Sequence, residues 1–327
     1  MNINSGFISS GFSSIFTRLF LFTFVLLMFS PLITACGGSG SNEEDGILTA
    51  EENDIRVGTH VIRCAMTAVT PEDVEQSNNA ISSARLLRWA RGFGNGRASG
   101  SVTVPVVVHV ISSGSSPAEG NVSDGTIAGQ IRVLNERYAG AGGGISTPFR
   151  FAVQQITRTV NPAWAAMEFG SVEEREAKSA LRVGDAGVLN LYLANPQDGT
   201  LGWAAFPWDY AGDLIFDGVV LLFGTLPGEA LAPYNQGITG VHEVGHWLGL
   251  FHTFQDGCGP PNDSILDTPP EAVEAFGCPL GRNTCGGDNA ADPVTNYMDY
   301  SDDACLVEFS TEQVERKDLL AAIFRGL

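Results

Sequence analysis

Along residues 101–327, apolar positions recur with two different periods, which predicts a domain that combines strands with helices. Residues 102–111 are a strongly apolar, β-branched run, which is typical of a buried strand. Residues 149–159 alternate partly and predict a second strand, and residues 189–194 and 217–223 are further strand candidates. After Ser123, a suitable helix cap, apolar residues return at helical spacing at Ile127, Ile131, Leu134 and Tyr138. The pattern therefore predicts a domain of the α+β class.

Two more helices are predicted from their start signals. Thr70 is a cap followed by proline and two acids, so a helix is expected to run to about Trp89. The run Ser-Thr-Glu-Gln from Ser310 is a capping box for a last helix. Its expected buried residues are Val314, Leu319, Leu320 and Ile323.

The remaining segments carry weaker patterns. Residues 199–207 read as an edge strand or rim rather than as core, and residues 255–305 are expected to be rich in loops. His109 lies inside the first predicted strand, so we interpret it as a packed histidine rather than a ligand.

The first residues have the pattern of an export signal. Arg18 precedes an apolar run over residues 19–33, so residues 1–35 are expected to be a signal peptide. No second run of that kind follows, which argues against an integral membrane protein. Small residues before Cys36 resemble a bacterial lipoprotein cleavage site, which predicts lipidation there and a flexible tether over residues 36–55. The alternative is an ordinary signal peptide with an incidental cysteine.

The charge balance argues against some classes of binding partner. The formal net charge is −19, from 18 basic and 37 acidic residues. Such a chain is not expected to bind nucleic acid or an anionic membrane surface. A membrane contact is expected only through the lipid. The excess of carboxylates suits an exported protein and leaves ligands available for Ca²⁺.

Five cysteines follow residue 50, and four of them cluster near the end of the chain. In an oxidising compartment these four should pair, with three possible connectivities. We favour Cys258 with Cys285 and Cys278 with Cys305, because the two bridges then close similar spans. Each would contribute roughly 3–4 kcal/mol on the chain-entropy model. Cys64 is left free.

The run His-Glu-Val-Gly-His-Trp-Leu-Gly-Leu-Phe-His that begins at His242 carries the clearest chemistry. On a helix, His242 and His246 share one face and can reach one metal ion. Glu243 is turned away from that ion and can take a proton from a water that the metal activates. Gly249 can end the helix and turn the chain back, so that His252 becomes a third ligand. Three neutral nitrogens with one open position describe catalytic zinc.

A simpler interpretation treats this helix as a buried amphipathic one whose histidines only find hydrogen bonds. The glutamate, the glycine and the third histidine together argue against it.

With a downstream methionine, this run resembles the metzincin zinc peptidases. Asn-Tyr-Met-Asp-Tyr over residues 296–300 is similar to their Met-turn. The chain is most similar to the pappalysin family of metzincins, in both the order and the spacing of several motifs. They are His-Thr-Phe-Gln from His252, Cys258, Asp-Thr-Pro from Asp267, Cys-Pro from Cys278, the Met-turn, Cys305, and the rim from Leu201 to Pro207. The similarity covers residues 98–327 and, more weakly, the region around Cys64.

The resemblance implies a fold and a set of roles. It implies a twisted mixed sheet and active-site helix in an upper lobe, above an irregular, disulfide-linked lower lobe with a C-terminal helix. The three histidines would hold Zn²⁺, and Glu243 would be the general base of peptide hydrolysis. Tyr300 would donate to the developing oxyanion, unless it is only a packed aromatic of the turn. Met298 would supply packing rather than chemistry.

Two further roles follow from the resemblance. Asp303 lies in the loop that shapes the primed-side pocket of similar enzymes, where a carboxylate would favour Arg or Lys just after the scissile bond. Cys64 resembles a cysteine switch that fills the open zinc position in the latent form. The family has glycine after this cysteine, whereas this chain has Ala65.

Calcium is a second expected cofactor. Similar proteins bind it in the acidic, loop-rich segment that here contains Asp263, Asp267 and Thr268. The alternative is that these are ordinary turn residues.

The predicted organisation has four parts. Residues 1–35 are the signal peptide, 36–55 the tether, 56–97 a propeptide, and 98–327 the zinc metallopeptidase domain. The glycine-rich junction between the last two is either a proteolytic site or a plain surface linker. Given the specificity that the resemblance implies, self-cleavage before one of four arginines would free the mature domain: Arg85, Arg88, Arg91 or Arg97.

These predictions combine into a secreted or surface-anchored zinc endopeptidase, made as a zymogen and acting on proteins or peptides as a monomer. It is expected at the bacterial cell surface or outer membrane, or free after processing. One alternative is a surface lipoprotein that keeps the zinc scaffold without cutting. Another is a metal hydrolase acting on non-peptide amides.

Overall fold

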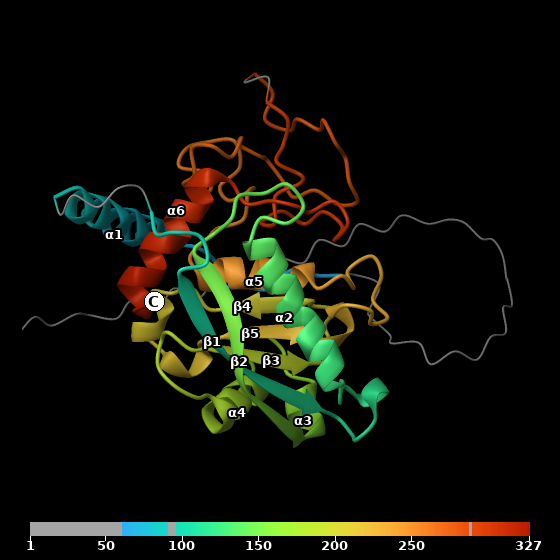
Figure 1. Cartoon of the computed structure of the whole chain (residues 1–327). Helices are drawn as coiled ribbons and strands as arrows, with labels where there is room; N and C mark the ends of the chain where they lie inside the picture. Colours follow the sequence, from blue (N-terminus) through green and yellow to red (C-terminus); the bar gives the residue numbers. More distant parts are fainter. Residues whose placement is uncertain (1–60, 91–95, 288–289) are drawn as a thin grey trace, which may run out of the picture. The chain divides into compact units, whose positions relative to one another are not determined.

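The computed structural model describes residues 61–90, 96–287 and 290–327 (Figure 1). The predicted signal peptide, the tether and Cys36 lie outside these residues. Within the described part of the chain, no helix combines the length and the apolar character needed to cross a membrane.

Five strands form one sheet in the order β2-β1-β3-β5-β4. All neighbours run parallel except β4, which is antiparallel to β5 and closes one edge. The sheet is therefore mixed, as expected, and the four strands predicted from apolar runs are confirmed. The bounds are β1 Val102–Ser112, β2 Phe149–Val160, β3 Leu189–Ala194, β4 Gly202–Ala204 and β5 Val219–Leu222.

Both faces of the sheet are covered, which explains why its inner strands are almost continuously apolar. In β3, Leu191 points into the larger core and Tyr192 into a smaller core on the opposite face. The larger core packs beneath α2 (Asp124–Tyr138) and α5 (Ile238–Trp247). The smaller one packs against α3 (Pro162–Ala165) and α4 (Val172–Leu181), which lie across the sheet from α2 and α5 in Figure 1.

The predicted start of α2 is confirmed, because the Ser123 side chain accepts a hydrogen bond from the Thr126 N–H. The four apolar residues predicted for its inner face are all buried. His109 is also packed as predicted: its ring nitrogens lie 2.9 Å from Thr157 Oγ1 and 3.0 Å from Asn190 Oδ1.

Two expectations about packing were wrong. Segment 199–207 does form an edge strand, but Trp203 is only 1% exposed. Two neighbouring segments account for this burial. The Nε1 of Trp203 donates to Glu174 of α4 at 2.6 Å, and residues 62–65 pair along the outer side of β4. Ile323 was expected to be buried but is 42% exposed, since the last helix changes winding after Leu320.

That last helix has two parts. The capping box at the start of α6 (Thr311–Leu320) is confirmed, and Leu319 and Leu320 are buried as predicted. Residues Ala321–Arg325 then form a π-helical turn, η5, whose wider winding breaks the 3.6-residue spacing on which the prediction for Ile323 depended. Val314 is half-buried.

Between Leu248 and Ser310 the described residues form turns and loops, as predicted, and two disulfides link them. Cys258 pairs with Cys285 and Cys278 with Cys305, each closing a separation of 27 residues. The interlaced pairing inferred from equal spans is therefore confirmed.

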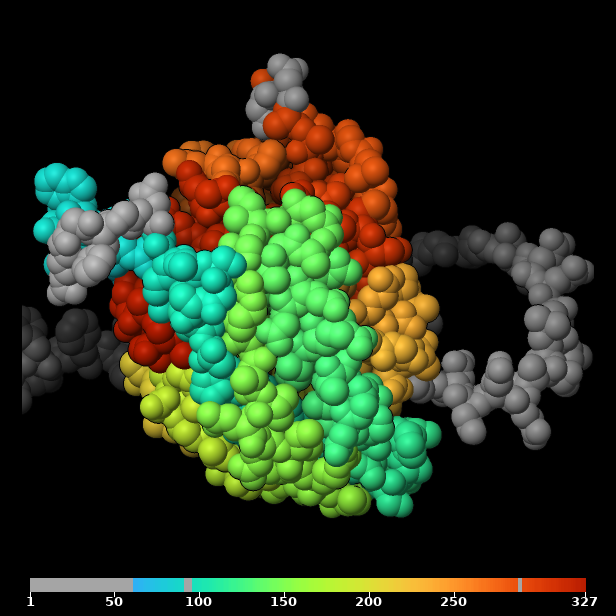
Figure 2. All heavy atoms as spheres, viewed as in Figure 1, coloured from blue at the N-terminus to red at the C-terminus, as the bar shows by residue number. Residues whose placement is uncertain are grey.

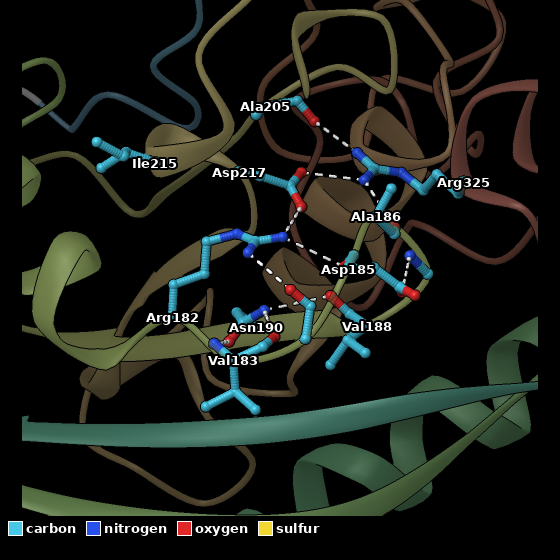
Figure 3. A network of polar contacts seen from close by, with 12 residues as sticks. Arg182, Val183, Asp185, Ala186, Val188, Asn190, Ala205, Ile215, Asp217 and Arg325 are labelled. Atoms are coloured by element: carbon cyan, nitrogen blue, oxygen red, sulfur yellow. Dashed lines mark hydrogen bonds and ion pairs between the residues drawn. The ribbon is translucent and has the colours of Figure 1, made fainter. Parts of the chain in front are cut away.

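A buried ionic network joins Arg325, near the end of the chain, to Asp217 and Arg182 (Figure 3). Asp217, just before β5, lies between Arg325 Nη1 at 3.0 Å and Arg182 Nη2 at 3.8 Å. Arg325 Nε also donates to the carbonyl of Trp247, the last residue of α5, at 2.6 Å. The network thus ties η5 to the helix end that follows His246.

Because Asp217 and Arg325 are both fully buried, replacing Asp217 with alanine leaves a guanidinium without its counter-charge. We expect Asp217→Ala to lower the free energy of unfolding by about 3–5 kcal/mol, measured by urea titration with the disulfides intact. The control is Glu136→Ala, which removes an exposed pair with Arg132 and should cost under about 1 kcal/mol. Equal losses in the two variants would contradict this account.

Candidate metal centre

Helix α5 and the turn after it bring three histidines to one point. His242 and His246 are one turn apart on α5, and their Nε2 atoms are 3.0 Å apart. Gly249 has φ +99°, a left-handed conformation that favours glycine, so the helix ends and the chain turns back. His252 then places its Nε2 3.2 Å from that of His242 and 3.0 Å from that of His246.

The chemistry of these nitrogens fits a bound cation. His242 Nδ1 donates to the Tyr297 carbonyl and His246 Nδ1 to the Leu250 carbonyl, each at 2.7 Å, so the second nitrogen of each neutral ring carries a lone pair. Burial lowers the pKa of all three rings, which keeps them neutral. Converging lone pairs repel one another unless a cation lies between them. Zinc with Zn–N bonds of about 2.0–2.1 Å needs nitrogens roughly 3.3 Å apart, close to the separations here.

Cys64 completes the set of donors. Its Sγ and the three histidine nitrogens all lie within 4.8 Å of one another, and no other group of His, Cys, Asp and Glu in the described parts of the chain meets this criterion. The backbone holds the cysteine there, since Ala65 N–H donates to the Gly202 carbonyl at 3.0 Å in parallel pairing with β4. The predicted free cysteine is therefore at the histidine cluster.

Glu243 lies beside the cluster with one carboxylate oxygen unused. The Cys64 thiol donates to its Oε2 at 3.4 Å, whereas the buried Oε1 has no hydrogen-bond partner. Burial raises the pKa of Glu243, and burial together with this carboxylate raises the pKa of the Cys64 thiol. A buried carboxylate with a free oxygen next to a metal position can accept a proton from water.

The Met-turn lies directly below α5, as its sequence indicated. Met298 is fully buried, and a Cβ atom at Gly245 would lie only 2.5 Å from its Sδ, so a larger residue at that position of the helix would displace the methionine. Tyr300 packs with its ring 4.9 Å from that of His252. Its hydroxyl donates to the Cys64 carbonyl at 3.3 Å, so it faces the cleft rather than the core.

Asp303 is buried behind this site and is paired with Arg63. Arg63 Nη1 lies 3.3 Å from Asp303 Oδ1, and the N–H of Gln236 donates to Oδ2 at 2.9 Å. Sequence reasoning assigned no role to Arg63, although its position directly before Cys64 was an available signal. The structure therefore places a basic side chain on the predicted specificity residue.

The candidate calcium residues divide into two places. Asp263 is buried and accepts hydrogen bonds from Thr268 Oγ1 at 2.6 Å and from Ile265 N–H at 3.0 Å. Burial raises its pKa to about 7. Asp267 instead accepts from the N–H of Glu312 at the start of α6. Asp263 and Thr268 thus lie together, and Asp267 faces a helix end.

Comparisons with known proteins find similar metalloproteases. Residues 205–321 match the model of the peptidase M43 family, described as pregnancy-associated plasma protein-A. An extracellular metalloprotease of Colletotrichum graminicola is 41% identical over 222 residues, covering 67% of this chain and 76% of that protein. One from Verticillium alfalfae is 39% identical over 283 residues, covering 83% of this chain and 95% of that protein.

Solved structures give the same assignment. Mature mirolysin of Tannerella forsythia, in complex with a cleaved peptide, is 30% identical with a TM-score of 0.60, and the match covers 69% of this chain and 97% of mirolysin. A promirolysin mutant of the same organism is 29% identical with a TM-score of 0.62, covering 78% and 89%. The chain therefore belongs to the pappalysin family of metzincin metalloproteases, peptidase family M43.

Proposed function

We propose that this chain is the latent precursor of an exported zinc endopeptidase. The observation that carries the proposal is the convergence of three histidine lone pairs next to the unpartnered Oε1 of Glu243. The names of the fungal relatives support export and metal-dependent proteolysis. Peptides and proteins are the proposed substrates, and we propose a monomer.

In this proposal His242, His246 and His252 hold Zn²⁺, which when bound lowers the pKa of water and polarises the substrate carbonyl. The carboxylate of Glu243 takes a proton from the attacking water and delivers it to the nitrogen of the leaving amine. The Tyr300 hydroxyl donates to the carbonyl oxygen as it gains negative charge. Its present hydrogen bond to the main-chain carbonyl of Cys64 supports that orientation.

Only one of the two alternative functions makes less use of these groups. A zinc-binding surface lipoprotein that does not cut has no need for a buried carboxylate with a free oxygen, which is costly to maintain. A hydrolase of non-peptide amides would use the same base and metal. The proposed peptidase and this hydrolase differ only in their substrates, so an assay of peptide digestion distinguishes them.

We expect Glu243→Ala to lower kcat/KM for peptide hydrolysis by about 10²–10⁴ while metal analysis still finds one zinc per chain. A chelator should abolish hydrolysis by the native enzyme, and added zinc should restore it. Glu136→Ala, on an exposed face of α2, is the matched control and should keep full activity. A fully active Glu243→Ala variant would refute the assigned base, and an enzyme that cleaves only non-peptide amides would favour the rival hydrolase.

Latency is supported by the contacts of residues 61–70 with the site. The Cys64 sulfur lies beside the three histidine nitrogens, where it would fill the fourth position of the proposed zinc site. Arg63 pairs with Asp303, and the backbone of this segment pairs beside β4. A peptide substrate needs the same positions. We therefore propose that Cys64 is a zinc ligand of the precursor, despite Ala65 in place of the family's glycine.

Helix α1 (Pro71–Ala90) follows this segment and packs against α6. Figure 2 shows α1 at the edge of the molecule, next to α6. Arg88 Nη2 lies 2.5 Å from Asp318, Arg97 also pairs with Asp318, and Arg85 pairs with Glu315 at 2.7 Å. Three arginines of the proposed processing region are thus held by α6, while Arg91 lies outside the described residues. We propose that cleavage in this region, residues 85–97, separates the propeptide from the catalytic domain.

Replacing Cys64 should weaken latency without altering the mature enzyme. We expect the Cys64→Ser precursor to hydrolyse peptides at least roughly tenfold faster than the native precursor before processing, because one zinc ligand is lost. Amino-terminal sequencing should find native chains that begin at or near one of the junction arginines and Glu243→Ala chains that remain uncut. A native precursor that is fully active while uncut would exclude the switch.

Calcium remains the second proposed cofactor, with Asp263, Asp267 and Thr268 in the segment that binds it. We expect millimolar Ca²⁺ to raise the melting temperature by several degrees, as saturation at a hundredfold its Kd contributes about 2.7 kcal/mol. The shift should be larger at pH 8 than at pH 6, because Asp263, with a pKa of about 7, must lose its proton to bind the ion. Mg²⁺ is the control ion. An equal shift in Asp263→Asn would contradict the site.

A further inference from the structure

The buried side chain of Arg63 has two different neighbours. Arg63 is only 4% exposed, and it directly precedes Cys64, whose sulfur lies at the proposed zinc site. Its Nη1 lies 3.3 Å from the carboxylate of Asp303, and its Cζ lies 4.4 Å from the centre of the Tyr234 ring. A side chain in the place of Arg63 therefore meets a negative charge together with an aromatic face.

The carboxylate by itself does not distinguish arginine from lysine. Oδ2 of Asp303 is occupied by the N–H of Gln236, so Arg63 reaches Oδ1 with one nitrogen instead of the two-point fork that favours guanidinium groups. A lysine ammonium could make the same single contact. Asp303 thus selects for positive charge.

The Tyr234 ring can distinguish arginine from lysine, which the carboxylate cannot do. A guanidinium is planar and weakly hydrated, so it stacks on an aromatic face at less cost than a compact, strongly hydrated ammonium. The loop that carries the ring is held in place, because Tyr234 N–H donates to the Leu231 carbonyl at 2.7 Å and Asn235 Nδ2 to the Glu229 carbonyl at 2.6 Å. The same loop carries Gln236, so it contributes to both contacts of Arg63.

We propose that Tyr234 is a specificity-determining residue that makes the Asp303 pocket prefer arginine over lysine at the substrate position next to the scissile bond. Arg63 occupies the place that a substrate arginine takes after the prosegment leaves. This proposal rests on the proposed peptidase function and names the side chain that this site selects.

The test compares processed enzymes on peptides that differ only in arginine, lysine or norleucine at that position. We expect the native enzyme to have a kcat/KM roughly tenfold or more higher for arginine than for lysine. Tyr234→Leu should reduce this ratio to about threefold or less, and Tyr234→Phe should keep it, because the ring is retained. Asp303→Ala should lower the rates for both basic peptides toward that for norleucine, which separates selection for charge from selection for shape.

Melting curves and zinc content of each variant exclude misfolding as the cause. An unchanged arginine-to-lysine ratio in Tyr234→Leu would overturn the proposal, as would its loss in Tyr234→Phe. A native enzyme that cuts peptides without favouring arginine would overturn only this inference. A native protein that cuts none of them would overturn the proposed function itself.

The uncut precursor gives an independent measurement. If Tyr234 recognises the guanidinium, Arg63→Lys should raise the activity of the uncut precursor several-fold in the native background. In Tyr234→Leu the same substitution should change it little, because the stacking surface is already gone. Equal effects in the two backgrounds would contradict stacking.

Discussion

The structure depends on three imidazole lone pairs that meet at one point. Two of the rings are oriented by carbonyl groups that lie outside α5: Tyr297 in the Met-turn holds His242, and Leu250 after the helix holds His246. Such orienting partners fix both the tautomer and the direction of a ligand. The main chain of the Met-turn therefore orients the His242 ring, which α5 alone would leave free to rotate. The lower lobe thus does more than enclose the site. The tight contact between Gly245 and Met298 follows from the same closeness of α5 to the turn.

The proposed prosegment contacts both buried acids of this site. Asp303 is paired with the Arg63 guanidinium, and the sulfur of the adjacent Cys64 lies beside Glu243 and the three histidines. Buried charges are costly unless they are paired, so Arg63 offsets the charge of Asp303 while Cys64 blocks access to the histidines. In the proposed mature enzyme, a basic substrate side chain takes the place of Arg63, and water takes the place of the Cys64 sulfur. On this view latency and specificity use the same two carboxylates.

Local patterns predicted much of this from the sequence. The spacing of His242, His246 and His252, the apolar runs of the strands and the equal spans of the disulfides are all encoded within short stretches of chain. The pairing of Arg63 with Asp303 joins residues 240 positions apart, and no local pattern reports that. The burial of Trp203 was missed for a similar reason, because it depends on α4 and on the prosegment. Ile323 was misjudged because the change to π-helical winding has no signal in the apolar spacing.

Side chains of the last helix support the end of α5, next to the histidine cluster. A helix leaves its final carbonyls without partners inside the helix, and buried ones must be satisfied from elsewhere. Arg325 donates to the carbonyl of Trp247 and Arg316 to that of Gly249, at 2.6 and 2.8 Å, so two guanidinium groups complete a helix end adjacent to His246. Their positive charge also suits the negative end of the helix dipole. Arg316 additionally donates to Ser77 and Asn78 of α1 through its two other nitrogens. Departure of the proposed prosegment would therefore remove these two contacts and leave the bond to Gly249 in place, so the turn that carries His252 would keep its support.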